Sequence, residues 1–456
     1  MSTKATSNIA SGWFDLTTLD GIDAGLYDGE ELHIIHEKSI VPIAHFSRIQ
    51  VPLVPQGNVT SAHYALGKTA GFAGNTYFTF TTQDITVKAA EQVNYRIAFA
   101  KNLGHNVMKV ATFNANDIPL VKFDSVALDA LSEANLPAGK YEGYMKMIGN
   151  VPKATSFSAH LPPITVKTHL HPLWFCQNGK TEPSRALALC CLKSNTMNFR
   201  FEFVKSLTEV IRIQRNHAAV PGTDPDDWQD EDPANVNLAT IVDVAGSEGL
   251  AMPMPEVWCE YVLIDDDHRR YMVSKSMDVL IEQIQSFTGS GITAGTHRQR
   301  FHFSYPMRYL WFGARNVTAA DKRNLSNYST NPDDESSGLD PCRKVTLWYE
   351  NSPRFQHLGG DVLSDMEYFY HAARVPTTKG HHLITYCYDT ASSGEIDGSA
   401  NYTKISSELE VQINETSTDS DDPATTPSTY NLEIRGVAFN LVRLEGGVLQ
   451  FPTFEG

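Results

Sequence analysis

The sequence lacks the features of secreted, membrane-spanning and disulfide-rich proteins. Six cysteines in 456 residues are too few for a disulfide scaffold, and no two of them form the Cys-x-x-Cys pair that many zinc sites use. The first residues contain no apolar core of a signal peptide, and no run approaches the about 18 apolar residues of a membrane helix. We therefore expect mostly buried, reduced thiols in a protein that is neither secreted nor membrane-spanning.

Positive charge is also scarce. The chain has 37 Lys and Arg residues against 53 Asp and Glu residues, so its net charge is −16. A broad basic face that binds nucleic acid is therefore disfavoured, and so is attraction to an anionic membrane surface. We expect an acidic, soluble surface that makes no direct contact with nucleic acid.

Phosphate-binding motifs are incomplete. Residues 67–69 and 179–181 both read Gly-Lys-Thr, which is the end of a phosphate-binding loop. Such a loop also needs a glycine five residues before each Gly-Lys pair, where Ala62 and Trp174 stand. Both segments are therefore interpreted as ordinary loops.

Metal-binding patterns are equally weak. His36 and Glu37 would begin a zinc-protease helix, but Ile40 replaces its second histidine. Residues 265–267 are three aspartates, yet adjacent side chains diverge and the following arginines compete for them, so a turn with ion pairs is favoured over a cation site.

Four histidines remain as candidate ligands, His169, His171, His381 and His382. Neighbouring residues of a strand point to opposite faces, so a structural or pH-sensitive role is favoured for the last two. No catalytic, cofactor-binding or metal-binding residue is predicted. The sequence also holds glycosylation acceptor patterns that have meaning only in a secreted protein, at Asn58, Asn316, Asn324, Asn327, Asn401 and Asn414.

Short runs of aromatic and β-branched residues are abundant, and they predict strands. Residues 71–82 combine a glycine-bearing turn with aromatic residues and threonines, and residues 198–203 alternate phenylalanine with polar side chains. Such alternation is typical of a strand with one buried face. Further strands are expected at residues 94–99, 110–113, 210–213, 301–303, 308–312, 345–349, 383–388 and 438–444.

The spacing of apolar residues changes within residues 256–285. An apolar run at 256–264 predicts a buried strand, which the three aspartates end. Met277, Leu280, Ile281 and Ile284 then recur at helical spacing. We expect a short helix there, with Leu280 and Ile281 closing one end of a sandwich.

One segment reads as a domain boundary. Residues 214–238 contain three prolines and six carboxylates, at positions 224, 226, 227, 230, 231 and 232. Self-repulsion and proline favour a linker or surface loop. Residues 316–340 and 415–429 are also predicted to be long loops.

Several motifs resemble, in order and spacing, the major capsid proteins of nucleocytoplasmic large DNA viruses, above all those of iridoviruses. The resemblance is patchy, reaches from residue 11 to about 450, and includes a proline-flanked aromatic cluster at 170–176. The matching residues are 101–107, 110–113, 116–118, 147–150, 260–262, 265–270, 280–283, 348–351, 374–376, 380–383, 401–402 and 438–444.

The resemblance implies an all-β fold of two consecutive eight-stranded jelly-roll sandwiches, a double jelly roll, with short helices in the loops. The expected domains are an N-terminal arm under the capsomer (1–29), a first jelly roll (30–213), an acidic linker or loop (214–238) and a second jelly roll (239–456). In that family the long loops lie at the outer tip or edge of the tower.

The function implied by the resemblance is structural and not enzymatic. It is that of a major capsid protein forming trimeric, pseudo-hexagonal capsomers of an icosahedral double-stranded DNA virus shell. Expected partners are two further copies of the chain, neighbouring capsomers, minor capsid and penton proteins, and the internal membrane through minor proteins. The chain would lie in the virion and assemble in the host cytoplasm. Composition alone indicates a large acidic all-β protein, for which a carbohydrate-binding or carbohydrate-hydrolysing sandwich is the alternative.

Overall fold

The structure is a computed structural model. It describes residues 46–68, 71–176, 186–218, 220–222, 225–246, 249–391, 397–413 and 428–451. From Ser47 onward these residues belong to one compact unit. The arm predicted at 1–29 lies outside the described residues.

In the part of the chain that the structure describes, residues 46–264 contain eight main strands in two sheets. When these eight strands are numbered 1 to 8 in chain order, neighbouring strands in one sheet are 1-8-3-6 and in the other 2-7-4-5. A short additional strand, β2 (Pro55–Asn58), pairs with strand 2 at the edge of the second sheet. The eight strands are β1 (Phe46–Leu53), β3 (Ser61–Ala65), β4 (Phe72–Thr81), β7 (Met108–Ala115), β8 (Ile118–Asp124), β10 (Thr165–His169), β11 (Met197–Phe203) and β15 (Glu256–Ile264).

The second half repeats this order, again 1-8-3-6 and 2-7-4-5. Its strands are β16 (Met277–Ile292), β17 (Gly295–Phe301), β18 (Pro306–Asn316), β19 (Cys342–Tyr349), β20 (Ser352–Gly359), β21 (His382–Thr385), β23 (Ser407–Ile413) and β24 (Tyr430–Glu445). The short strands β22 (Ala400–Asn401) and β25 (Val448–Gln450) pair with β18 and β24. Two antiparallel sheets of this kind form a jelly roll, so the predicted double jelly roll is confirmed.

The two sheets of the first jelly roll meet through aromatic side chains. On β11, Phe199, Phe201 and Phe203 are buried while Arg200 and Glu202 are exposed, as the alternation predicts. Phe203 packs edge-on against Phe78 of β4 in the facing sheet, with ring centroids 5.3 Å apart. The strands predicted at 71–82 and 198–203 are therefore confirmed.

Shorter elements fill the connections. Two three-stranded sheets comprise β13 (Trp228–Glu231), β12 (Ile211–Asn216) and β6 (Tyr95–Phe99), and β14 (Val242–Val244), β5 (Ile85–Val87) and β9 (His160–Leu161). The helices are α3 (Leu103–Asn106), α4 (Ser125–Asn135), α5 (Ala138–Met147), α6 (Pro152–Thr155), α7 (Leu238–Ile241), α8 (Asp266–Ser274), α9 (Val317–Asp321), α10 (Glu367–His371), the π-helix η5 (Val362–Met366), and the 3₁₀ turns η3 (Leu189–Cys191), η4 (Leu207–Glu209) and η6 (Tyr402–Lys404).

The strand pairing does not change at the acidic segment predicted as the boundary. Part of that segment is β13, which pairs with β12, and the buried carboxylate of Asp230 forms an ion pair with Arg212. The later strand β15 pairs with β4 along residues 256–262. Residues 214–238 therefore lie between the seventh and eighth strands of the first jelly roll, and the sheets change partners at α8.

The helix predicted over 277–284 is wrong. These residues begin β16, which pairs with β24 in an antiparallel ladder. Met277, Val279 and Ile281 alternate along the strand and pack against the first core, where Ile281 is fully buried. The helix lies earlier, at α8, because the Asp265 carboxylate caps its N-terminus by accepting a hydrogen bond from the His268 N–H at 2.8 Å.

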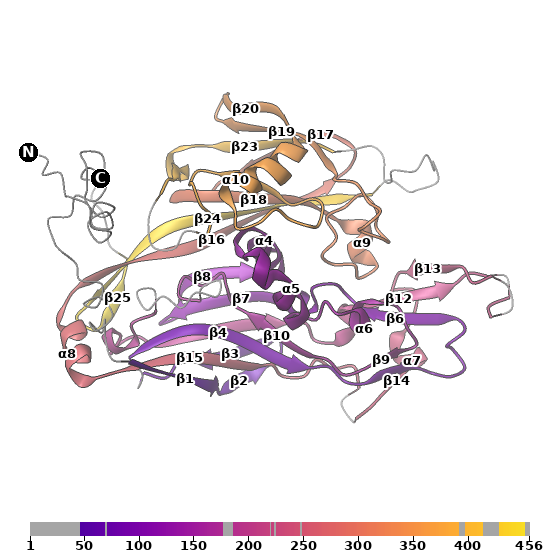
Figure 1. Ribbon diagram of the computed structural model, residues 1–456, viewed down its shortest axis with the longest axis horizontal. Helices are drawn as coiled ribbons and strands as arrows, with labels where there is room; N and C mark the ends of the chain where they lie inside the picture. The colour runs from indigo at the N-terminus through magenta and orange to yellow at the C-terminus, as the bar shows by residue number, and fades with distance from the viewer. Residues whose placement is uncertain are drawn as a thin grey trace, which may run out of the picture. The chain divides into compact units, whose positions relative to one another are not determined.

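Helix α4 lies between the strands of the two jelly rolls (Figure 1). Ala127 and Leu128 belong to the core of the first jelly roll. Val126, Ala130, Leu131 and Ala134 pack instead with residues of the second jelly roll, among them Tyr309 and Trp311 of β18. Because Leu310 and Phe312 of the same strand lie in the second jelly roll's own core, β18 is buried on both faces.

Candidate functional site at the junction of the jelly rolls

Helix α4 carries two carboxylates, Asp129 and Glu133, into the interior. They are 3% and 5% exposed, so burial is nearly complete. A buried carboxylate is costly unless hydrogen bonds or an opposite charge compensate it. The partners of these two residues therefore decide how the jelly rolls are held together.

Asp129 is bound from both jelly rolls. Its Oδ1 accepts hydrogen bonds from Asn102 Nδ2 at 2.8 Å and His105 Nδ1 at 2.6 Å. Its Oδ2 accepts from Ser326 Oγ at 2.7 Å and from the Tyr328 hydroxyl at 3.3 Å, both in the second jelly roll. One side chain thus joins residues 102–105 to residues 326–328, which lie more than 200 residues later in the chain.

The pKa of Asp129 follows from these contacts. Burial alone would raise the pKa, but the hydrogen bond and positive charge of His105, with the hydrogen bond from Ser326, outweigh it and lower the pKa below its ordinary value of 3.8. Asp129 is therefore an acceptor only, and His105 carries a proton on Nδ1.

The His105–Asp129 pair has the form of a catalytic dyad but no access to a substrate. The second ring nitrogen of His105 lies 2.7 Å from the Tyr144 hydroxyl, and His105 is fully buried. The cavity beside Asp129 has a volume of about 10 Å³, which is room for about one water. This geometry serves packing rather than chemistry on a ligand.

Two arginines of the second jelly roll complete the junction. Arg374 forms an ion pair with Glu133, and both side chains are almost fully buried. Arg435 of β24 binds Asp124, at the end of β8, through two hydrogen bonds of 2.7 and 3.2 Å. Arginine presents a planar fork that matches a carboxylate, so these contacts fix orientation as well as distance.

The candidate histidines lie in three places. His169 and His171 have ring centroids 6.4 Å apart, and His171 is buried beside His105 and Tyr144 in the first jelly roll. His381 packs on Tyr328 at the junction. His382 instead stacks on Phe312 in the second core at 4.8 Å, which confirms that the adjacent pair points in opposite directions.

The other candidate motifs are structural where they are described. The Gly67 N–H donates to the Tyr261 hydroxyl at 2.9 Å, and Lys68 Nζ donates to the carbonyl of Lys193 at 3.0 Å. Residues 36–37 and 179–181 lie outside the described residues. Three of the glycosylation asparagines are buried, namely Asn316, Asn324 and Asn327.

The loop predicted at 316–340 is not confined to the outer surface. Residues 326–330 are buried, and Ser326 also accepts a hydrogen bond from Asn106 Nδ2 of the first jelly roll at 2.8 Å. Its side chains satisfy its own backbone; Asn327 Oδ1, for example, accepts from the Ser329 N–H at 2.8 Å. This part of the loop belongs to the junction.

Sequence reasoning missed the junction. The α4 segment, Ser-Val-Ala-Leu-Asp-Ala-Leu-Ser-Glu-Ala-Asn, carries a signal in retrospect, because Asp129 and Glu133 are one helical turn apart among small and apolar residues. Nothing local indicates their partners in the second jelly roll, which are separated from them by about 200 residues or more.

Two family models match consecutive parts of the chain. The model for the N-terminus of the major capsid protein matches residues 48–265, and the model for the large eukaryotic DNA virus major capsid protein matches residues 268–449. They meet at the point where the strand pairing changes from one jelly roll to the next.

Individual proteins agree with these matches. The chain is 27% identical to the major capsid protein of Costelytra zealandica iridescent virus, over 98% of this chain and 99% of the other, and 28% identical to that of Wiseana iridescent virus, over 97% and 93%. The solved Faustovirus major capsid protein has the same fold, with a TM-score of 0.69 at 10% identity over 95% of each chain.

The fold and the junction define a double jelly-roll protein. The chain belongs to the major capsid proteins of large eukaryotic DNA viruses, and the two relatives named above are those of iridescent viruses. These are structural proteins and not enzymes, so the carbohydrate-binding or carbohydrate-hydrolysing alternative is not favoured. Among the described residues, no helix is long and apolar enough to cross a membrane.

Proposed function

We propose that three copies of this chain form a pseudo-hexagonal capsomer of an icosahedral double-stranded DNA virus shell. The observation that carries the proposal is the repeated strand order, 1-8-3-6 and 2-7-4-5, in two jelly rolls that are joined by one buried and one partly buried ion pair. Each chain then contributes two walls to the capsomer, one from each jelly roll, which have the same fold but different surfaces. A head-to-tail contact that closes after three chains produces six walls, which tile a surface.

The domains of this capsomer subunit follow from the pairing. The first jelly roll extends to Ile264, with the acidic segment as an insertion, and the second begins with β16 after α8. Residues 1–29 serve as the arm under the capsomer, as the family resemblance implies.

An exposed aromatic patch supports contact between copies. Phe369, Tyr370 and Tyr388 are 70%, 63% and 80% exposed, and a hydrogen bond of 3.0 Å from His371 Nδ1 to the Tyr388 carbonyl holds the two segments together. Such clusters on a protein surface mark contact sites. We assign this surface, called the α10 patch below, to the contact with a neighbouring chain of the capsomer.

The charge of the chain sets a condition on the trimer. A net charge of −16 on each copy opposes association, so the buried area must be on the order of 2,000 Å² or more, as in obligate assemblies. Salt screens that repulsion, and the trimer is therefore stable at high ionic strength. The acidic residues 224–232 remain outside the contact.

The remaining partners follow from the same role. Neighbouring capsomers, penton proteins and minor capsid proteins contact the outer walls and the base, and minor proteins connect the shell to an internal membrane. The acidic surface does not bind nucleic acid directly. Assembly takes place in the host cytoplasm.

Light scattering on the purified full chain tests the proposal. We expect three times the chain mass of 50.6 kDa at micromolar concentration in both low and high salt. A double substitution Phe369→Asp and Tyr388→Asp should give monomers. As a control, Tyr271→Asp changes another exposed aromatic side chain, on α8 and 56% exposed, and should keep the trimer.

Two results would contradict parts of the proposal separately. A monomeric wild-type chain at every salt concentration, with binding to a glycan array, would return the carbohydrate alternative. A trimer that survives the double substitution would remove the α10 patch from the contact and leave the capsomer itself in place.

A further inference from the structure

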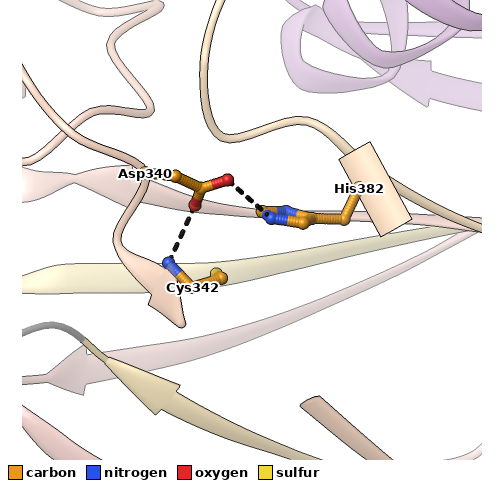
Figure 2. A group of neighbouring side chains, drawn as sticks. All are labelled: Asp340, Cys342 and His382. Carbon is orange, nitrogen blue, oxygen red and sulfur yellow. Dashed lines mark hydrogen bonds and ion pairs between the residues drawn. The ribbon is translucent and has the colours of Figure 1, made fainter. Parts of the chain in front are cut away.

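Three side chains with metal-binding atoms meet at one end of the second jelly roll. Asp340 ends the long loop before β19, Cys342 begins β19, and His382 begins β21 (Figure 2). β19 and β21 belong to the two different sheets of this jelly roll. The group therefore spans the sandwich from one sheet to the other.

The donor atoms are close together. His382 Nε2 lies 2.9 Å from Asp340 Oδ2, and Asp340 Oδ1 accepts a hydrogen bond of 2.8 Å from the Cys342 N–H. The carboxylate, the thiol sulfur and the imidazole nitrogen all lie within 4.8 Å of one another. Ligands of a tetrahedral zinc ion are about 3.3–3.6 Å apart, so only a small movement is needed.

His382 is a second, independent observation. The residue is fully buried, yet among the described residues neither ring nitrogen has a hydrogen-bond partner. Nε2 is near the Asp340 carboxylate, but the contact lacks hydrogen-bond geometry. A buried polar atom without such a partner is unusual and costly, and a metal ion would satisfy it.

Gly360, which has no side chain, allows Cys342 and His382 to approach each other. A Cβ at that position would lie 1.9 Å from the Cys342 carbonyl oxygen and 3.4 Å from His382 Nε2. Any side chain there would displace β19 from the strand that carries the histidine. The backbone of a third segment thus contacts two of the three candidate ligands.

We propose that Asp340, Cys342 and His382 bind a zinc ion. One thiolate, one imidazole and one carboxylate form a donor set suited to zinc, whereas magnesium and calcium prefer oxygen alone. The two negative ligands neutralise the double charge of the ion, so the buried site carries no net charge. A water completes the coordination on the side of Asp340, whose side chain is 27% exposed.

The zinc ion would link the two sheets of the second jelly roll. Binding requires the Cys342 thiol to lose its proton to solvent, because zinc binds the thiolate.

Cobalt substitution tests the proposal on the full chain. After removal of metal with a chelator, titration with Co²⁺ should produce a near-ultraviolet thiolate-to-cobalt band that saturates at a single equivalent, and zinc should abolish it. Cys342→Ser should lose the band. Cys387→Ser, which changes another buried cysteine of the same jelly roll, should keep it.

A second variant covers the case in which Cys342→Ser does not fold. Asp340→Asn keeps an oxygen for the Cys342 N–H but removes the charge, and it should weaken cobalt binding about 10-fold or more. The absence of a thiolate band in the wild type would overturn the proposal. Equal metal affinity of the wild type and Asp340→Asn would overturn it as well.

Discussion

Arg374 of the second jelly roll and Glu133 of the first form an ion pair in which the two side chains are 5% and 6% exposed. Tyr141 closes the cluster, since its hydroxyl donates to Glu133 Oε1 at 2.8 Å and its ring lies 3.3 Å from the guanidinium carbon. The relative position of the two jelly rolls therefore depends on a charge pair almost sealed from water.

Loss of one partner should be strongly destabilising. Glu133→Gln leaves the arginine charge buried without a counter-charge, so it should lower the free energy of unfolding by about 3–5 kcal/mol. The double substitution Glu133→Leu and Arg374→Met removes both charges and should restore much of that loss. Denaturant unfolding measures both; a double variant as unstable as the single one would show that packing, and not charge, holds the junction.

The strand β16 leads to a second prediction. Ile281 is fully buried against the first core, so Ile281→Ala should cost about 2–5 kcal/mol through the cavity that it leaves. Leu280, on the opposite face of the same strand, is only half-buried, and Leu280→Ala should cost less. Equal losses in thermal unfolding would indicate that both residues face a core, as the helical spacing had suggested.

The error over residues 277–284 has a physical cause. Met277, Leu280, Ile281 and Ile284 match a helix, but Met277, Val279 and Ile281 match a strand equally well. Short apolar segments are ambiguous in this way, and pairing with a distant partner decides between the two. Here the partner is β24, more than 150 residues later.

Local patterns were sufficient elsewhere. The alternating phenylalanines of β11 predicted a strand with one face buried, and the apolar run of β15 predicted a strand with both faces buried. The composition of residues 214–238 led to a domain boundary in the wrong place. Clustered carboxylates indicate a segment in contact with solvent, but they do not indicate where one jelly roll ends and the next begins. The junction around Asp129 could not be predicted, since it depends on which distant side chains satisfy a buried charge.

A third prediction concerns the thiols. All six cysteines are free and buried, including Cys190 and Cys191, whose sulfur atoms lie 3.8 Å apart. Thiol titration should therefore return six free thiols after denaturation. The hydrogen bond from Cys191 lowers the pKa of Cys190 to about 7, so Cys190 should be alkylated first in the native protein. Fewer than half of the thiols free on denatured protein would contradict the reduced state.

The last prediction is a loss of stability in mild acid. Burial, with the nearby charges of His105 and His169, lowers the pKa of His171 well below 6.5, and burial also lowers the pKa of His381 despite the opposing charges of Glu133 and Asp129. Below pH 6.5 the unfolded chain binds protons that the folded chain does not. The stability that each of these histidines provides is therefore complete above pH 6.5, and it should fall by at most about 1.4 kcal/mol per pH unit until the pH reaches the pKa of that histidine in the folded chain.

Substitution separates this effect from general acid denaturation. His171→Asn should flatten the fall in the free energy of unfolding between pH 6.5 and 5, whereas His302→Asn, at an exposed position, should leave it unchanged. Asp129 affects stability in a lower pH range than the histidines. Because its pKa in the folded chain is lower than the ordinary 3.8, the stability it provides is present above pH 3.8 and is lost as the pH falls further. Urea unfolding at a series of pH values resolves both ranges, and an unchanged slope in His171→Asn would show that this histidine is not the group that titrates.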